Sequence, residues 1–205
     1  MTRYPEPGKV KTRLLPALGA TGAARLHRQM VEHTMSTIRG VAANSPVKIF
    51  LFFQGGSEAL MALWLGNEVE YLPQAGGDLG DKMRGAFEVV FKRGFASAVI
   101  IGTDCPALDH QILSRAFCEL EEAGMVIGPA LDGGYYLLGL KQVHDRLFTG
   151  ISWGGSEVLK QTLAAACAEY LTVKQLPELS DIDRPEDLEN LKKMAAFSAW
   201  HNVSD

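Results

Sequence analysis

The chain has 205 residues, of which 47% are hydrophobic, and a formal net charge of −4 at pH 7. This composition is typical of one globular domain with a substantial core. It gives no indication of a nucleic-acid or membrane partner, because the bulk charge is negative and no apolar run approaches the roughly 20 residues of a membrane span. Three cysteines without metal spacing, and the lack of a visible signal peptide, predict a reduced, cytoplasmic protein.

Expected helices and strands alternate along the chain. Only Met1 and Thr2 precede an N-terminal loop, so the first strand is expected to be nearly absent, or the chain begins late. Continuous apolar runs predict buried strands at 47–53, 97–102 and 125–129, and YYLLGL at 135–140 is typical of a strand that returns antiparallel. Helices are expected at 21–39, 79–93, 110–123, 155–169 and 185–197. The alternation predicts a largely parallel α/β sheet in a single domain over 1–205.

The N-terminal loop RYPEPGKVKTRL, residues 3–14, carries the densest positive charge. Residues 1–28 contain six Lys or Arg and one acid, Glu6. Pro5 and Pro7 stiffen the loop and would reduce the entropy lost when it is ordered. Because a local positive region in an acidic protein suits a small anionic ligand, the sequence predicts a clamp for the phosphates of a nucleotide.

Two acidic segments are candidates for a metal site. Asp104 follows a buried strand, where open α/β sheets place their ligands, and its oxygens suit Mg²⁺ or Mn²⁺. The alternative is a turn bond or a helix cap. In DIDRPEDL, residues 181–188, Asp181 or Asp183 is a candidate second carboxylate, while Asp183 and Asp187 could instead serve the N-terminus of the next helix.

Two glycine-rich segments are candidates for ligand contact. GGDLGDKM, residues 76–83, leads into a helix whose N-terminus and Lys82 favour an anion, the alternative being a flexible loop with Lys82 solvated. Asp132, Gly133 and Gly134 are either a plain hairpin turn or a place where a ligand approaches the backbone while Asp132 binds a hydroxyl.

Residues 150–154 match the G-x-S-x-G pattern of serine hydrolases, with His201 downstream. The pattern requires a buried strand before the serine. The preceding segment, 141–149, is polar, so the sequence disfavours this function. Trp153 within the pattern either stacks on a sugar or base, or packs internally.

Taken together and in order, these segments resemble the nucleotide-diphospho-sugar transferase superfamily, which has the GT-A fold. The chain is similar to a bacterial glycosyltransferase-like branch related to phospholactate and molybdopterin guanylyltransferases. The matching segments are YPEPGKVKTRL, GDLGDKM, IIGTDCPAL, IGPALDGGYYLLGL, ISWGGSEVL and DIDRPEDL, which span residues 3 to 188. The resemblance implies a three-layer α/β fold with a mostly parallel sheet, an antiparallel hairpin and helices on both faces.

The resemblance also implies roles for individual residues. Lys11, Arg13, Asp104 and Asp132 are expected to be catalytic. The implied nucleotide-binding residues are Pro7, Gly8, Lys11, Arg13, Gly80, Lys82 and Asp104. The implied acceptor or sugar pocket contains Asp132, Gly133, Gly134, Tyr135 and Trp153. The implied ligands of a divalent Mg²⁺ or Mn²⁺ are Asp104 and Asp183, with Asp181 as the substitute.

Three functions follow as hypotheses. The first is metal-dependent glycosyl transfer from a nucleotide-sugar to a small acceptor. The second is nucleotidyl transfer, in which a phosphorylated acceptor attacks an NTP and releases pyrophosphate. It is suggested by Thr103-Asp104-Cys105-Pro106, which lacks the D-x-D of glycosyltransferases and resembles the single aspartate before proline of nucleotidyltransferases. The third is nucleotide binding without turnover.

Overall fold

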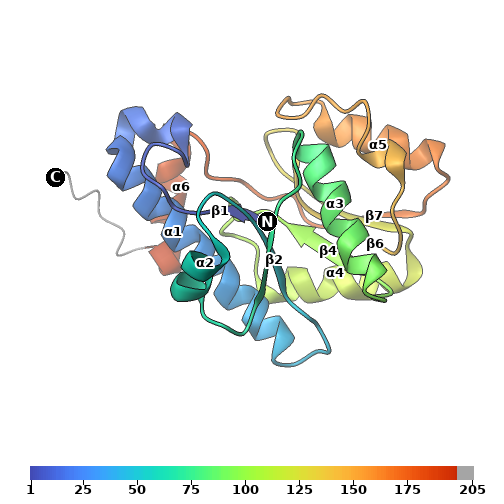
Figure 1. The fold of residues 1–205 in the computed structure, drawn as a ribbon. Helices are drawn as coiled ribbons and strands as arrows, with labels where there is room; N and C mark the ends of the chain where they lie inside the picture. The colour runs from blue at the N-terminus through green and yellow to red at the C-terminus, as the bar shows by residue number, and fades with distance from the viewer. Residues whose placement is uncertain (198–205) are drawn as a thin grey trace. The chain divides into compact units, whose positions relative to one another are not determined.

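The structure, a computed structural model, describes residues 1–197 of the chain. Its contacts divide into two compact units (Figure 1). Within the described residues, unit 1 contains Met1–Leu72, Thr103–Leu108 and 181–197, and unit 2 contains Pro73–Gly102 and Asp109–Ser180. His201, which the serine-hydrolase pattern would need, lies outside the described residues. Within the described part, no helix is both long enough and apolar enough to span a membrane.

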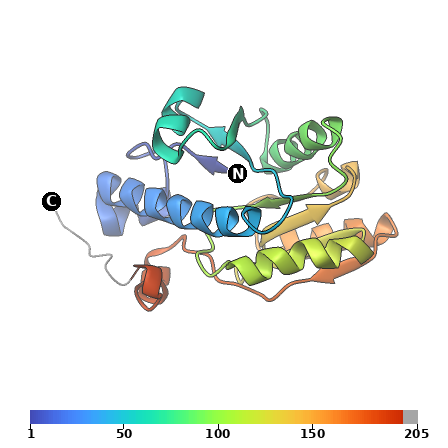
Figure 2. The same ribbon diagram turned by 90° about the horizontal axis from the view of Figure 1, so that it is seen from below.

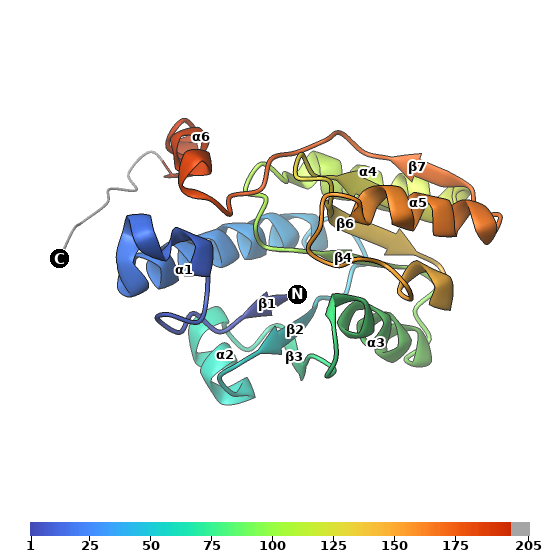
Figure 3. The same ribbon diagram turned by 90° about the horizontal axis from the view of Figure 1, so that it is seen from above.

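Unit 1 contains a three-stranded sheet in the order β1-β2-β3, formed by β1 (Thr2–Arg3), β2 (Phe50–Gln54) and β3 (Glu70–Pro73). Figure 3 shows the three strands side by side. β1 pairs parallel with β2, with Thr2 opposite Phe53. The first strand, expected to be nearly absent, is thus only two residues long. The second strand begins later than predicted because Val47 donates its N–H to Ser45 O in a turn.

The helices of unit 1 include one that the sequence predicted and one that it missed. A 3₁₀ turn, Thr12–Leu14, leads into α1 (Leu15–Ala42), the longest helix, seen in blue in Figure 2. Gly19 has non-helical angles and kinks α1, and the helix after the kink contains the predicted 21–39. The missed helix is α2 (Glu58–Leu65), although Ser57 accepts from Leu60 N as an N-cap should.

The core of unit 1 is built on one face of β2. Leu51 and Phe53 are two residues apart and therefore point to the same side of the strand. They pack in a cluster that draws on both helices and β3: Val31, Met35, Met61, Leu65, Val69 and Tyr71. A second cluster joins the start of α1 to the C-terminal segment through Leu14, Ala23, Leu26, Met30, Ile182, Leu188, Leu191 and Phe197.

The prediction of one continuous helix at 185–197 is wrong. The segment contains a 3₁₀ turn (Pro185–Asp187), the short α6 (Leu188–Lys192) and another 3₁₀ turn (Ala195–Phe197). The N–H groups of Lys193 and Met194 bond three residues back instead of four, which tightens the last turn of α6 and ends it.

Unit 2 contains a mixed four-stranded sheet in the order β4-β6-β5-β7. Its strands are β4 (Ala98–Ile101), β5 (Met125–Pro129), β6 (Tyr135–Leu140) and β7 (Val173–Gln175). β6 is antiparallel to both β4 and β5, as predicted, and β5 pairs parallel with β7. The predicted α/β class is confirmed. The sequence missed β7, which has only three residues and little buried surface.

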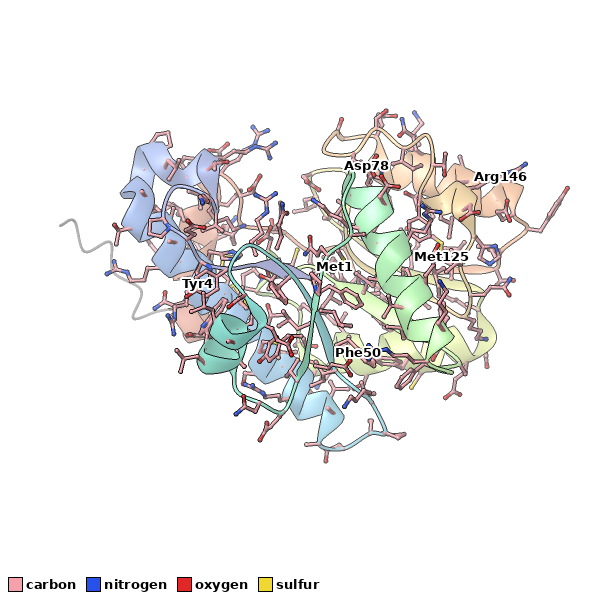
Figure 4. The ribbon with its side chains drawn as sticks, in the orientation of Figure 1. Met1, Tyr4, Phe50, Asp78, Met125 and Arg146 are labelled. Carbon is pink, nitrogen blue, oxygen red and sulfur yellow. The ribbon has the colours of Figure 1, made fainter. Side chains whose placement is uncertain are left out.

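Three helices of unit 2 match their predicted positions closely: α3 (Leu79–Lys92), α4 (His110–Glu122) and α5 (Val158–Ala168). Asp109 caps α4, since its Oδ1 accepts from Ile112 N at 2.8 Å. Asp78 lies at the start of α3 (Figure 4).

Met61 and Leu63 test how α2 is oriented. Met61 is fully buried, while 85% of Leu63 is exposed. We expect Met61→Ala to lower the free energy of unfolding by about 2–5 kcal/mol, because it leaves a cavity. Leu63→Ala should change it by less than about 0.5 kcal/mol. Urea unfolding measures both, and equal losses would contradict the packing of this helix.

Candidate functional site

The candidate site of unit 1 is centred on an ion pair between Lys11 and Asp104. Lys11 Nζ lies 2.8 Å from Asp104 Oδ1 and also donates to the main-chain carbonyl of Ile182. The two side chains differ sharply in exposure, with 3% for Lys11 and 51% for Asp104. The ammonium is therefore buried beneath a carboxylate that faces solvent.

This arrangement differs from the predicted role of Lys11. The sequence suggested that Lys11 contacts phosphate directly, together with Arg13. A buried ammonium with two partners of its own chain has little surface left for a phosphate, so direct contact does not fit this structure. The alternative for Asp104, a helix cap, does not apply either, because Asp109 caps the next helix.

A second ion pair lies two residues further along the same loop. Arg13 Nη1 bonds to Asp183 Oδ2, and 60% of the Arg13 side chain is exposed. Ile182 N donates to Asp104 O at 2.8 Å, which joins the segments that carry the two carboxylates. The structure thus brings together Lys11, Arg13, Asp104 and Asp183, the residues to which the resemblance assigned the phosphate and metal contacts. Asp181 lies on the other side of Ile182 and is partly buried.

Asp187 takes the capping role that the sequence left open. Its carboxylate accepts from the backbone N–H groups of Asp183 and Arg184 at 2.9 and 2.7 Å. This frees the Asp183 side chain from capping, and it binds Arg13 instead.

The donor chemistry of unit 1 fits a small divalent cation. Asp104 and Asp183 offer carboxylate oxygens, and Mg²⁺ is commonly held by one or two carboxylates completed by substrate phosphates. Among the described residues, no group of three or more His, Cys, Asp or Glu side chains could hold a metal ion. A cation held by these two carboxylates would therefore take its remaining oxygens from water or from a bound phosphate.

The loop before Lys11 is held by Tyr4, labelled in Figure 4, which contacts residues outside the loop. The Tyr4 ring lies so close to Gly56 that a Cβ at that glycine would be 2.7 Å from Tyr4 Cγ. Tyr4 also meets the Trp64 ring of α2 edge-on, at 6.1 Å between centroids. Pro7 and Gly8 are exposed, and Gly8 has φ +78, so the turn at this point suits glycine.

Two histidines of α1 support the loops that carry the site, and sequence reasoning missed both. His27 Nε2 donates to Arg3 O, and His33 Nε2 donates to Pro106 O, each at 3.0 Å. His27 is buried. Burial lowers the pKa of His27 below its ordinary value, and the hydrogen bond to Arg3 and the charge of Asp104 offset this only in part. The histidines are scattered in sequence, so no motif pointed to them.

In unit 2, Gly133 of the Asp132-Gly133-Gly134 turn is required by the chain itself. Asp132 Oδ1 accepts from Gly134 N at 2.8 Å, which is the hairpin interpretation. Gly133 has φ +88, and a Cβ there would lie 2.0 Å from Ser156 O. The close approach predicted for a ligand is thus made by the backbone of Ser156. A ligand role for Asp132 and Gly134 remains a prediction.

Gly80 and Trp153 form a packing contact in unit 2. A Cβ at Gly80 would lie 2.5 Å from Phe148 O and 2.6 Å from Trp153 Nε1. The Trp153 ring also meets Tyr135 edge-on at 6.4 Å. Trp153 Nε1 is buried and has no hydrogen-bond acceptor among the described residues. Of the two interpretations of Trp153, internal packing is the one that these contacts match, and Gly80 belongs to the same packing.

The N-terminus of α3, predicted to bind an anion with Lys82, carries two carboxylates. Asp78 Oδ1 accepts from Asp81 N at 3.0 Å, and Asp81 Oδ2 accepts from Asp78 N at 3.3 Å. This capping box uses amides that were expected to be free for phosphate, and its negative charge opposes an anion. Lys82 lies in the first turn of this helix.

Tyr135, predicted to line an acceptor pocket, lies at the start of β6 with its hydroxyl donating to Met83 Sδ at 3.9 Å. Burial raises the pKa of the Tyr135 hydroxyl, so it is protonated at neutral pH.

Comparisons with known proteins place the chain among bacterial relatives. Residues 37–155 match a family described as "Uncharacterized protein conserved in bacteria (DUF2064)". A crystal structure titled "putative nucleotide-diphospho-sugar transferase", from Desulfovibrio desulfuricans G20, is 31% identical with a TM-score of 0.86, covering 98% of this chain and 88% of that one. A search of curated proteins found no match.

A more distant structure shares the fold alone. Molybdopterin-guanine dinucleotide biosynthesis protein A from Archaeoglobus fulgidus is 16% identical with a TM-score of 0.52, covering 92% of this chain and 94% of that one.

His27 predicts how stability depends on pH. Its folded pKa lies below the ordinary 6.5, so the unfolded state binds a proton that the folded state refuses as the pH falls below 6.5. The titration of His27 should therefore lower the free energy of unfolding by up to about 1.4 kcal/mol for each pH unit of acidification. Urea unfolding at pH 7.5 and 5.0 should show a smaller loss for His27→Gln than for the wild type. His110→Gln, at an exposed histidine, is the control and should keep the wild-type difference.

Gly80 predicts a steric cost inside a helix. Alanine normally favours a helix by up to about 1 kcal/mol over glycine. We expect Gly80→Ala to destabilise instead, by about 1–3 kcal/mol, because its Cβ meets Phe148 O. Gly40→Ala in α1, where a Cβ has no atom within 4 Å, should be neutral or stabilising. Thermal unfolding measures both variants, and equal changes in their unfolding temperatures would contradict this packing.

Proposed function

The chain belongs to the bacterial family DUF2064, within the nucleotide-diphospho-sugar transferase superfamily, and on this premise we propose that it transfers a glycosyl group from a nucleotide-sugar to a small acceptor. The 31% identity to the Desulfovibrio protein over 98% of this chain supports a transferase role. The finer assignment depends on the site of unit 1.

The paired charges of unit 1 carry this proposal. Breaking a sugar–phosphate bond builds negative charge on the phosphate oxygens of the leaving group. Arg13 is exposed and presents a planar guanidinium that suits phosphate, on a loop already ordered by its contacts with Asp104 and Asp183. Its pairing with Asp183 would be exchanged in part for the phosphates of the donor.

Asp104 and Asp183 are the residues that would hold Mg²⁺ or Mn²⁺. Bound there, the ion would supply Lewis-acid stabilisation of the leaving phosphates. The chain's own residues orient the donor: Arg13 neutralises its charge, and the loop fixed by Tyr4 and Gly56 keeps Arg13 in place. Asp132, which is exposed on its turn in unit 2, is our candidate for contact with a sugar hydroxyl.

Nucleotidyl transfer is the second candidate. The observation that favours it is the single aspartate of Thr103-Asp104-Cys105-Pro106, without the D-x-D pattern. The same site would then stabilise pyrophosphate as the leaving group, with a phosphorylated small molecule as the acceptor.

A thermal-shift panel tests the proposal. Nucleotide-sugars and NTPs are each added with Mg²⁺, with Mn²⁺ and with EDTA, because a ligand that binds only the folded state raises the unfolding temperature. We expect a metal-dependent shift with at least one nucleotide-sugar. A shift with NTPs alone would favour nucleotidyl transfer, and no shift with any nucleotide would contradict both.

Arg13→Gln should weaken binding of the active nucleotide by about tenfold or more, since a charged hydrogen bond contributes about 1.5–3 kcal/mol. Arg115→Gln is the matched control, because Arg115 is an exposed arginine of unit 2 paired with Glu119. Equal affinities for the two variants would remove Arg13 from the site. Product analysis by mass spectrometry then separates transfer from binding without turnover.

A further inference from the structure

We propose that Lys11 is a positioning residue that holds Asp104 for cation binding, and that it does not contact the donor phosphates. This inference rests on the proposed function, because it concerns the same metal-binding carboxylate. It assigns different tasks to two cations of the loop, with Lys11 acting on the chain itself and Arg13 acting on the ligand.

The first support is the asymmetry of the ion pair. The ammonium of Lys11 is almost wholly buried, while half of the Asp104 side chain is exposed. One carboxylate oxygen, Oδ1, is bound by Lys11 at 2.8 Å. The lysine thus fixes the carboxylate from its inner side and leaves its outer side directed to solvent, where a cation can approach.

The second support is that Lys11 bonds both segments that carry candidate ligands. Its ammonium reaches Asp104 and the carbonyl of Ile182, the residue before Asp183. Ile182 N in turn donates to Asp104 O at 2.8 Å. These bonds join the two segments through groups of the chain alone, so removing Lys11 would release Asp104 and loosen its link to Asp183.

The third support is the backbone of Lys11. Its φ is +47 and its ψ is 47, the left-handed region that side-chain-bearing residues rarely adopt. Val10 and Leu14 on either side are buried and hold the loop in this conformation. From this turn the Lys11 side chain points inward, since only 3% of it is exposed, which is the direction required to position a carboxylate and the wrong one for a ligand in solvent.

Binding of Mn²⁺ alone tests whether Lys11 positions Asp104 or acts only through its charge, because the two roles predict opposite changes in Mn²⁺ affinity. If Lys11 were only a cation near the site, Lys11→Met would remove repulsion and Mn²⁺ would bind equally well or more tightly. If Lys11 positions Asp104, Lys11→Met should weaken Mn²⁺ binding about tenfold or more, as loss of an outer-shell partner does in metal sites. Electron paramagnetic resonance of free Mn²⁺ measures this affinity without any turnover.

Three variants complete the experiment. Lys9→Met, which removes an exposed cation of the same loop paired with Glu6, should leave Mn²⁺ affinity unchanged. Asp104→Asn should weaken it as much as Lys11→Met does, and the double variant should be no weaker than either. Lys11→Arg keeps the charge in another shape, and its Mn²⁺ affinity should lie between those of Lys11→Met and the wild type. If Lys11→Met fails to fold, Lys11→Arg takes its place in the experiment.

The outcomes of the two proposals can be told apart. If the wild type binds neither Mn²⁺ nor any nucleotide, the proposed function fails and this inference fails with it. If the wild type binds both, but Lys11→Met binds Mn²⁺ at least as tightly as the wild type, only the positioning role is overturned. Wild-type Mn²⁺ affinity in Lys11→Arg would equally overturn it, since charge alone would then suffice.

Discussion

The structure of unit 1 depends on the buried ammonium of Lys11. A charge removed from water is costly unless it is paired and hydrogen-bonded, and Lys11 meets this requirement with Asp104 and the carbonyl of Ile182. The three partners lie at positions 11, 104 and 182 of the chain. Satisfying one buried charge therefore brings three distant segments together, and these are the segments that carry the candidate site.

The glycines of unit 2 illustrate a general ambiguity in glycine-rich motifs. A glycine permits close approach, but the sequence does not reveal what approaches. At Gly133 it is the backbone of Ser156, and at Gly80 it is Phe148 O together with the ring of Trp153. The sequence predicted that a ligand approaches the backbone at Gly133 and Gly134, and in the structure the backbone of Ser156 occupies that position at Gly133.

Strong periodicity made several elements predictable. The strand at 125–129 is fully buried and read as an unbroken apolar run, and α3 and α4 have apolar stripes with clear caps. Elements with weak local signals were not predicted: α2 is apolar around most of its surface, and β7 has three residues, two of them exposed. Such elements are fixed by their neighbours and not by their own pattern.

The sequence by itself determined the α/β class, the position of Asp104 shortly after β4, and the concentration of positive charge between residues 3 and 14. These follow from local periodicity and charge, which the linear chain records. Only the tertiary structure decided that Lys11 points inward to Asp104 and that Arg13 points to Asp183. The physical reason is that two cations two residues apart are equivalent in a linear pattern. Their surroundings distinguish them, because the Lys11 side chain is buried beside Asp104 while most of the Arg13 side chain is exposed beside Asp183.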